Sequence, residues 1–376
     1  MRSLHTHRQR PSSPLRPMAL SLVPLALACS SSSAPQTSSD GGVFDARSGV
    51  DAGADGSGRD AAKDTALSGK DVSSPPDAQS DGGGDAARTG VFVAVGTGGR
   101  HVRSIDDGVT WIDDGALPPD AGSGDFIGLR TAVFGNDEFV GLGWRAMTSP
   151  DGNTWTDRGL LSINQWIGSA VYAQGKYVGL GGYGLRATSP DGVVWTDHSI
   201  DTVAAHPGAC LSYADVMGGR FVSCNDNGAR HYSPDGVTWT ASTGATSSLT
   251  NGIAFGNSLF VGMESLSVVV SADGGATWTA APDLPSAGVA IRFAGGQFFI
   301  FGQDNVFTSP DGMTWTAHAV TGFDATTTVA YGDGTFVMLT GQGFIHSTDG
   351  LTWSAPVAID NTTNPIGWLT FGTPSP

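Results

Sequence analysis

A short phrase recurs seven times between residues 104 and 353, and this repetition constrains the fold more than any other feature of the sequence. Five copies read SPDGNTW, SPDGVVW, SPDGVTW, SPDGMTW and STDGLTW, and two carry one additional residue, SIDDGVTW and SADGGATW. The copies end at Trp111, Trp155, Trp195, Trp239, Trp278, Trp315 and Trp353, which lie 37 to 44 residues apart. A regular period of this length indicates an array of similar structural units.

Two aromatic residues precede most copies of the phrase. The first occupies Phe134, Tyr172, Tyr213, Phe255, Phe293 and Tyr331, and the second occupies Phe92, Phe139, Tyr177, Phe221, Phe260, Phe298 and Phe336. In five of the six units that contain both, the two aromatics are five residues apart and enclose a turn rich in Gly, Asn and Asp. That spacing predicts a β-hairpin. Each unit therefore consists of a hairpin, a third strand, the SxDGxTW turn and a fourth strand.

Four short strands in each unit of about 40 residues are typical of a β-propeller, in which every blade packs on its two neighbours. The first unit lacks its innermost strand, but residues 364–372, NPIGWLTFG, match that strand and place Phe371 in the first aromatic column. Helix formers such as Glu and Lys are scarce from residue 89 onward. We therefore predict an all-β, seven-bladed propeller of four-stranded blades over residues 89–376. The C-terminal strand is expected to pair with residues 91–96 and close the ring.

The SxDGxTW phrase resembles the Asp-box of the BNR-repeat propellers. The resemblance implies that the phrase forms the turn between the third and fourth strands of each blade. Seven near-identical copies around a ring suit a structural role, whereas a catalytic centre needs unlike residues that converge on one point. We therefore expect the turn aspartates to stabilise the blades: Asp106, Asp151, Asp191, Asp235, Asp273, Asp311 and Asp349.

Residues 1–29 have the pattern of a targeting segment. Four arginines lie among the first 16 residues, and the apolar run Met18–Ala28 that follows is too short to span a bilayer as a helix. The run ends directly before Cys29. A targeting segment that ends on a cysteine resembles a bacterial lipoprotein signal, and this resemblance implies lipidation of Cys29. This resemblance implies a cell-envelope protein anchored in the outer membrane. Ordinary secretion, with Cys29 unmodified, is the alternative.

Residues 30–88 consist mainly of Ser, Gly, Ala and Asp and contain almost no aromatic residues. Such a composition buries too little apolar surface to offset the entropy of ordering, so a disordered tether is expected. The acidic run over residues 51–64 lacks the ligand spacing and the final Glu of an EF-hand loop. We therefore expect no metal site in this segment.

Residues 89–376 are acidic, with 25 Asp and Glu against 10 Lys and Arg, a net charge of −15. A nucleic-acid partner requires a basic surface, and docking on anionic lipid requires one too, so this balance argues against both. The expected contact with a membrane is therefore the lipid on Cys29 alone. We expect a monomer.

A ligand site is expected on the loop face, which is the end of the propeller that carries the connections between second and third strands and between successive blades. Unlike residues gather in these connections, and one strand position adds a cation, since Arg292 stands where the other units carry Val, Ser, Ala or Thr. We expect Arg292 to reach the central channel. The alternative is that Arg292 only extends toward solvent and that the loop residues are ordinary surface. The candidates are Arg100, Trp144, Arg145, Trp166, Tyr183, Asp226, Glu264, Arg292 and Asp304.

The Asp-box family includes sialidases, so an enzyme must be considered. That resemblance implies three converging arginines, an acidic acid/base residue and a Tyr–Glu nucleophile pair. The sequence has no Arg-Ile-Pro-like motif, and Glu138 falls in a turn on the opposite end from the loop face, which leaves Glu264 as the single glutamate near it. The histidines are dispersed without the spacing of metal ligands, and we predict neither a metal nor another cofactor.

In size the chain is closer to the photosystem II stability/assembly factors, which are single seven-bladed Asp-box propellers that act as binding scaffolds. We interpret the protein as a non-enzymatic binding or scaffold module outside the cytoplasm. Its expected partner is a protein or a glycan on the loop face. A sialidase-like glycoside hydrolase or a carbohydrate-binding propeller is the alternative.

Cys210 and Cys224 flank the aromatic pair Tyr213 and Phe221 of the fourth unit. If these aromatics face each other across the hairpin, three residues outward on each strand leads to the two cysteines. Opposite residues in an antiparallel pair lie within disulfide reach, and an exported domain meets an oxidising compartment. We predict a disulfide between Cys210 and Cys224. The alternative is a pair of buried thiols.

Overall fold

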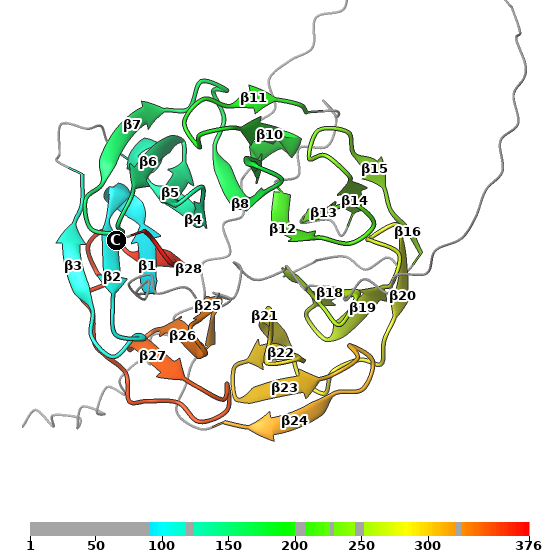
Figure 1. Ribbon diagram of the computed structural model, residues 1–376. Coiled ribbons are helices and arrows are strands. Elements are labelled where there is room, and N and C mark those ends of the chain that lie inside the picture. Colours follow the sequence, from blue (N-terminus) through cyan, green and yellow to red (C-terminus); the bar gives the residue numbers. More distant parts are fainter. Residues whose placement is uncertain are drawn as a thin grey trace, which may run out of the picture. The chain divides into compact units, whose positions relative to one another are not determined.

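The computed structural model describes residues 90–117, 124–199, 208–225, 229–244, 252–320 and 325–375. Strands dominate this part of the chain and form seven sheets that stand around a common axis (Figure 1). The described residues contain three short 3-10 helices and no α-helix. None of the helices found there is long and apolar enough to cross a bilayer. The prediction of an all-β, seven-bladed propeller is confirmed.

Each sheet is one blade whose first strand lies next to the axis, and blades 1 to 4 have four strands each. Blade 1 consists of β28 (Ile366–Gly372), β1 (Val91–Gly96), β2 (His101–Ser104) and β3 (Ile112–Gly115). Blade 2 consists of β4 (Leu129–Gly135), β5 (Glu138–Gly143), β6 (Arg145–Ser149) and β7 (Thr156–Leu160). Blade 3 consists of β8 (Ile167–Ala173), β9 (Lys176–Gly181), β10 (Arg186–Ser189) and β11 (Thr196–Asp197). Blade 4 consists of β12 (Gly208–Ala214), β13 (Arg220–Asn225), β14 (Arg230–Ser233) and β15 (Thr240–Ala241).

Blades 5 to 7 complete the ring. Blade 5 consists of β17 (Gly252–Gly256), β18 (Leu259–Glu264), β19 (Ser267–Ser271) and β20 (Thr277–Ala280), with β16 (Thr243–Gly244) parallel to β20. Blade 6 consists of β21 (Gly288–Ala294), β22 (Gln297–Gly302), β23 (Asn305–Ser309) and β24 (Thr316–Ala319). Blade 7 consists of β25 (Ala325–Gly332), β26 (Thr335–Thr340) and β27 (Gly343–Ser347). The 3-10 helices are η1 (Thr97–Gly99), η3 (Gly124–Ile127) and η4 (Gly182–Gly184).

The outer edge of blade 7 differs from the four-stranded pattern. Here a single bridge between Phe344 and Val357 stands in place of the fourth strand. Two backbone hydrogen bonds of 2.7 and 3.0 Å join these two residues. Pro356 directly precedes Val357 and has no backbone N–H, so it cannot extend the ladder.

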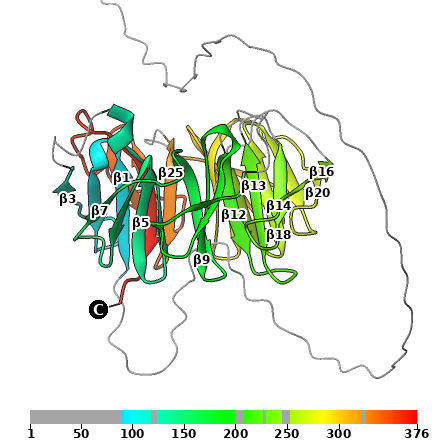
Figure 2. The same cartoon turned by 90° about the horizontal axis from the view of Figure 1, so that it is seen from above.

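The C-terminal strand β28 closes the ring by antiparallel pairing with β1. Phe92 lies opposite Phe371, as the predicted closure requires. Figure 2 shows the blades from the side, with the C-terminus beyond one end of the strands. The Phe371 ring lies against Gly332 of blade 7, where a Cβ atom would come within 2.1 Å of it. Blade 7 therefore accepts this ring because residue 332 has no side chain.

The predicted aromatic pairs face each other across the first two strands of every blade. Their ring centroids are 4.6–4.8 Å apart, within the range that favours tilted aromatic packing. The rings pack between blades, and the fully buried Tyr177 donates a hydrogen bond to the carbonyl of Gly135 in the preceding blade. Burial raises the pKa of the Tyr177 hydroxyl. The pairs are Phe92–Phe371, Phe134–Phe139, Tyr172–Tyr177, Tyr213–Phe221, Phe255–Phe260, Phe293–Phe298 and Tyr331–Phe336.

The seven SxDGxTW turns share one hydrogen-bond pattern. In each, the Ser hydroxyl donates to the Asp carboxylate over 2.8–3.0 Å. The same carboxylate accepts the backbone N–H of the residue before Trp over 2.7–2.9 Å. In six turns the indole N–H of Trp donates to a glycine carbonyl over 2.9–3.2 Å. The side chains thus replace water as partners of the turn backbone.

Substitution of one turn aspartate tests the strength of this pattern. Backbone N–H groups of Thr314 and Met313, together with the Ser309 hydroxyl, lower the pKa of Asp311 below its usual value of 3.8. We expect Asp311→Ala to lower the free energy of unfolding by about 1 kcal/mol, because the freed N–H groups are exposed and regain water. The exposed Asp304, whose side chain makes no such bonds, supplies the control Asp304→Ala.

The loss should also depend on pH. A carboxyl whose pKa is lower in the folded state stabilises the fold above the unfolded pKa, and this contribution disappears as the pH falls through the folded value. The stability difference between wild type and Asp311→Ala, measured by urea unfolding, should therefore shrink below about pH 4. A difference that is constant from pH 7 to pH 2 would contradict this role for the carboxylate.

Blade 4 holds the two cysteines of the propeller. The structure joins Cys210 of β12 and Cys224 of β13 in a disulfide, with Cα atoms 5.2 Å apart. The two residues lie directly opposite each other in the register that also pairs Tyr213 with Phe221. The bridge therefore closes the hairpin that has the longest turn between its aromatic residues.

Candidate functional site

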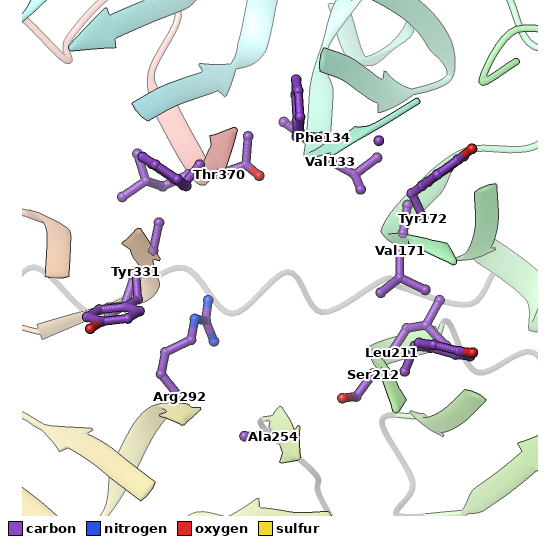
Figure 3. A pocket seen from close by; sticks show the side chains of 18 of the residues that line it. Val133, Phe134, Val171, Tyr172, Leu211, Ser212, Ala254, Arg292, Tyr331 and Thr370 are labelled. Carbon is purple, nitrogen blue, oxygen red and sulfur yellow. The ribbon is translucent and has the colours of Figure 1, made fainter. Parts of the chain in front are cut away.

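The first strands of the blades surround a cavity of about 570 Å³ on the axis of the propeller. Its walls come from seven strands, β4, β8, β12, β17, β21, β25 and β28 (Figure 3). On β4, β8, β12, β21 and β25 the lining residues lie between the middle of the strand and its end, next to the turn into the following strand, and on the short β17 they are Ile253 and Ala254. We call that end of the propeller the turn face, since the turns between first and second strands lie there. The cavity thus extends toward the end opposite the loop face.

Equivalent positions on the strands form three rings in the cavity wall. The ring of positions nearest the turn face carries aromatic residues. The ring of positions farthest from it carries aliphatic residues such as Leu211, Ile253 and Leu369. The ring between them consists of small or short side chains with one exception, because Arg292 occupies the position in blade 6. The members of this middle ring are Val133, Val171, Ser212, Ala254, Arg292, Ala330 and Thr370.

Arg292 projects from β21 into the open space of the cavity (Figure 3). Its Nη1 donates a hydrogen bond of 2.6 Å to the carbonyl of Ile291. Burial lowers the pKa of Arg292 to about 10, which still leaves the guanidinium protonated at neutral pH. Within the described ranges, no carboxylate forms an ion pair with it. The cavity therefore contains a positive charge whose other N–H groups face a space large enough for a ligand.

The neighbours of Arg292 explain why the cavity is open. A ring of seven large side chains would fill the axis, whereas Ala254, Ala330 and Ser212 leave room on both sides of the guanidinium. Figure 3 shows the hydroxyl groups of Ser212 and Thr370 turned toward the same space. The middle ring combines apolar side chains, two hydroxyl groups and one cation, a composition typical of small-molecule sites.

Two of the predicted loop-face residues are used inside the blades. Arg100 is buried, pairs with Asp113 over 2.6 Å, and also donates to backbone carbonyls of residues 360, 363 and 364. Arg145 is buried and binds both carboxylate oxygens of Asp157 over 2.9 and 3.0 Å. Neither guanidinium is turned outward for a ligand on the loop face.

The predicted aromatic residues of the loop face lie in blades 2 and 3. Trp144 packs on Phe126 of η3 with centroids 5.2 Å apart. Trp166 lies under the guanidinium of Arg130, 4.6 Å from its ring centroid. Tyr183 of η4 is 61% exposed. The structure thus adds two residues, Phe126 and Arg130, that no motif in the sequence singled out.

Among the remaining predicted residues, the structure describes the side chain of Asp304 alone. Asp304 is exposed in the connection between β22 and β23. Asp226 lies outside the described residues, as does Cys29, and the structure describes the backbone of Glu264 at the end of β18 without its side chain. In the described ranges, no three His, Cys, Asp or Glu side chains come together in a way that suits a metal ion.

Comparison with known proteins agrees with the architecture and goes no further. No family model matches the sequence, and no curated protein matches it. Among solved structures, virginiamycin B lyase from Staphylococcus aureus superposes with a TM-score of 0.52 at 9% identity, covering 62% of this chain and 85% of that one. The computationally designed Ika8 protein gives a TM-score of 0.51 at 13% identity, covering 76% and 91%. YCF48 bound to D1 peptide gives 0.49 at 15% identity, covering 60% and 81%. At these identities the two similarities with TM-scores above 0.5 show a shared β-propeller fold alone.

Proposed function

We propose that this protein is an exported, lipid-anchored and non-enzymatic propeller that binds a small ligand in its central channel. The observation that carries the proposal is the cavity of about 570 Å³ with Arg292 as its one cation among the described lining residues. Pockets of 300–1,000 Å³ with apolar walls and a few placed polar groups are typical of ligand sites. The resemblance of the SxDGxTW turns to Asp-boxes supports the same class, because it assigns those turns a structural role.

Binding without chemistry is supported by the groups that line the cavity. Acid–base catalysis needs a titratable group placed at the reacting atoms. Of the described lining residues, Asp137 is the one carboxylic acid, and it belongs to the turn between β4 and β5 at the edge of the cavity. Its Oδ1 accepts the backbone N–H of Ser375 over 2.9 Å, which ties it to the C-terminal segment. Arg292 can orient an anion, but on its own it does not transfer protons at neutral pH.

The binding proposal can be tested with a variant that fills the cavity. Thr370 is partly exposed on the cavity wall, so Thr370→Phe places a ring in the space that a ligand would occupy. We expect native mass spectra of wild-type protein, purified from the cell envelope of its native host, to show an additional small-molecule mass that disappears on denaturation. Thr370→Phe should lack that mass, and the control Thr156→Phe, on the exposed outer strand β7, should keep it. An unliganded wild type, or a mass that all three proteins share, would contradict channel binding.

Export and anchoring are a separate part of the proposal, supported by the arginines before residue 17, the apolar run Met18–Ala28 and Cys29. We expect Cys29→Ser to move the protein from the membrane fraction to the soluble envelope fraction, because acyl chains on that thiol are the one proposed anchor. The control Ser32→Ala should stay with the membrane. Membrane association of Cys29→Ser that equals that of wild type would overturn the lipoprotein interpretation. The outer membrane is proposed because Ser30 is the residue that follows the cysteine.

Glycan binding on the loop face is a second candidate, and the aromatic residues of blades 2 and 3 favour it. Phe126 is 54% exposed and packs on Trp144, Tyr183 is 61% exposed, and Trp166 lies under the Arg130 guanidinium. Aromatic faces pack well against the C–H faces of sugar rings while polar edges remain hydrated. A glycan array compared between wild type and Tyr183→Ala tests this candidate. Binding that survives Thr370→Phe but not Tyr183→Ala would place the ligand on the loop face.

A further inference from the structure

We infer that the channel ligand is an organic monoanion, a carboxylate carried on an apolar body, whose carboxylate binds Arg292. This inference rests on the proposed channel function and specifies its ligand. It follows from three features of the cavity: the number of charges, the geometry of the guanidinium and the character of the walls.

The charge of the site matches one negative charge and no more. Among the described residues that line the cavity, Arg292 is the one cation, and Asp137 adds a carboxyl group near the turn face. A buried ion pair is tolerated when the charges compensate each other, whereas an uncompensated charge in a low-dielectric site is costly. A phosphate monoester would bring close to two negative charges into a propeller whose net charge is already −15. A carboxylate offsets the single charge of Arg292, while Asp137 is exposed at the edge of the cavity and keeps its contact with water.

The guanidinium is held in a way that suits a carboxylate. Its Nη1 donates to the Ile291 carbonyl over 2.6 Å, which restrains the rotation of the side chain. The planar fork of an arginine presents paired N–H groups that match the two oxygens of a carboxylate. Ser212 and Thr370 belong to the same ring of the wall and turn their hydroxyl groups to the cavity. The two hydroxyl groups lie on opposite sides of the cavity (Figure 3), so each can donate a hydrogen bond to a different polar atom of a ligand.

The remaining wall suits an uncharged, apolar body. Val133, Val171, Leu211 and Ile253 line the cavity together with the aromatic residues near the turn face. Contact with such walls favours alkyl or aromatic groups and disfavours heavily hydroxylated ones, because buried hydroxyls need partners that aliphatic side chains cannot provide. A cavity of about 570 Å³ accommodates a small molecule, not a folded partner. The ligand is therefore an amphiphile with one anionic end.

Calorimetric titration with a matched series of probes tests this inference. Octanoate and octanamide share a seven-carbon alkyl chain, octyl phosphate has an eight-carbon one, and the three head groups differ in charge. We expect wild type to bind octanoate at least about tenfold more tightly than the other two, since a charge-assisted pair adds roughly that factor. Arg292→Met, which keeps an unbranched apolar stem without the guanidinium, should remove the preference over octanamide, and Arg292→Lys should retain part of it. The control Arg158→Met, on the exposed β7, should bind as wild type does.

The outcomes separate this inference from the proposed function. Equal affinity for octanoate and octanamide, or tighter binding of octyl phosphate, would overturn the inference that the ligand is a monoanion. If Thr370→Phe then bound neither octanoate nor octanamide, the channel would still be the binding site. Absence of octanoate binding to folded wild type, or octanoate binding that Arg292→Met leaves unchanged, would also overturn it. Melting temperatures of the variants within a few degrees of wild type ensure that lost binding is not lost folding.

Discussion

Removal of residues 365–376 will abolish the cooperative folding of the propeller. The deletion removes β28, which supplies the innermost strand of blade 1 and buries Ile366, Leu369 and Phe371. Burial of three such side chains contributes on the order of 6 kcal/mol, about as much as the whole stability of many domains. The deletion also leaves β1 with an unpaired edge that can pair with other chains. We therefore expect aggregation and no cooperative unfolding transition.

Thermal unfolding followed by circular dichroism, together with size-exclusion chromatography, measures this effect. Deletion of residues 374–376 alone is the matched control, because these residues follow β28 and the deletion removes the exposed Ser375 hydrogen bond to Asp137 but no strand. Should the longer deletion itself yield no soluble protein, Phe371→Ala serves as a milder variant. It removes a ring that packs on both Phe92 and Gly332 and should cost about 3–5 kcal/mol. A soluble protein without residues 365–376 that melts as wild type does would contradict closure by β28.

Arg100→Met will destabilise the propeller by about 3 kcal/mol. The Arg100 guanidinium lies between Asp113 of β3 and the carbonyls of residues 360, 363 and 364, which precede β28. It therefore fastens the returning C-terminal segment to blade 1. Methionine keeps an unbranched apolar stem but leaves the carboxylate and the carbonyls without this donor. Breaking a buried pair is costly because the remaining group stays desolvated, although the partial exposure of Asp113 reduces the penalty.

Urea unfolding of Arg100→Met against wild type measures the loss. The control is Arg158→Met on the exposed β7, where a single hydrogen bond to Thr148 is removed and a change below about 1 kcal/mol is expected. Asp113→Asn should fall between the two, since it removes the charge of the partner but keeps an acceptor. Equal stabilities for Arg100→Met and Arg158→Met would show that the Arg100 interactions contribute nothing measurable to the free energy of unfolding.

The repeats made the ring predictable from the sequence. Each blade repeats the same pair of aromatics, so the distance between Phe134 and Phe139 in the chain is enough to predict a hairpin. The absence of a first strand in blade 1 and its presence after Trp353 then predict the closure. In both cases the information is local or recurs in several units, and for that reason pattern alone is sufficient.

The ligand site could be predicted only in part. The exceptional position of Arg292 within its column indicated the channel, but the open volume depends on six small or short side chains that meet from strands far apart in the chain. Arg100 and Arg145 were expected on the loop face because both lie between second and third strands. Their partners Asp113 and Asp157 stand on the adjacent outer strands, and nothing in one sequence shows that the side chains turn inward to meet them. Ion pairs of this kind depend on which residues lie opposite each other on adjacent strands, and a sequence motif does not contain that information.

The measurement that tests the channel as ligand site most directly is a crystal structure of the protein with octanoate. We expect density for the ligand inside the ring of first strands, with its carboxylate within hydrogen-bond distance of the Arg292 guanidinium and its chain along the aliphatic and aromatic walls. Density for octanoate bound elsewhere, such as at Trp144 and Tyr183 on the loop face, with the channel empty of ligand, would contradict the proposal.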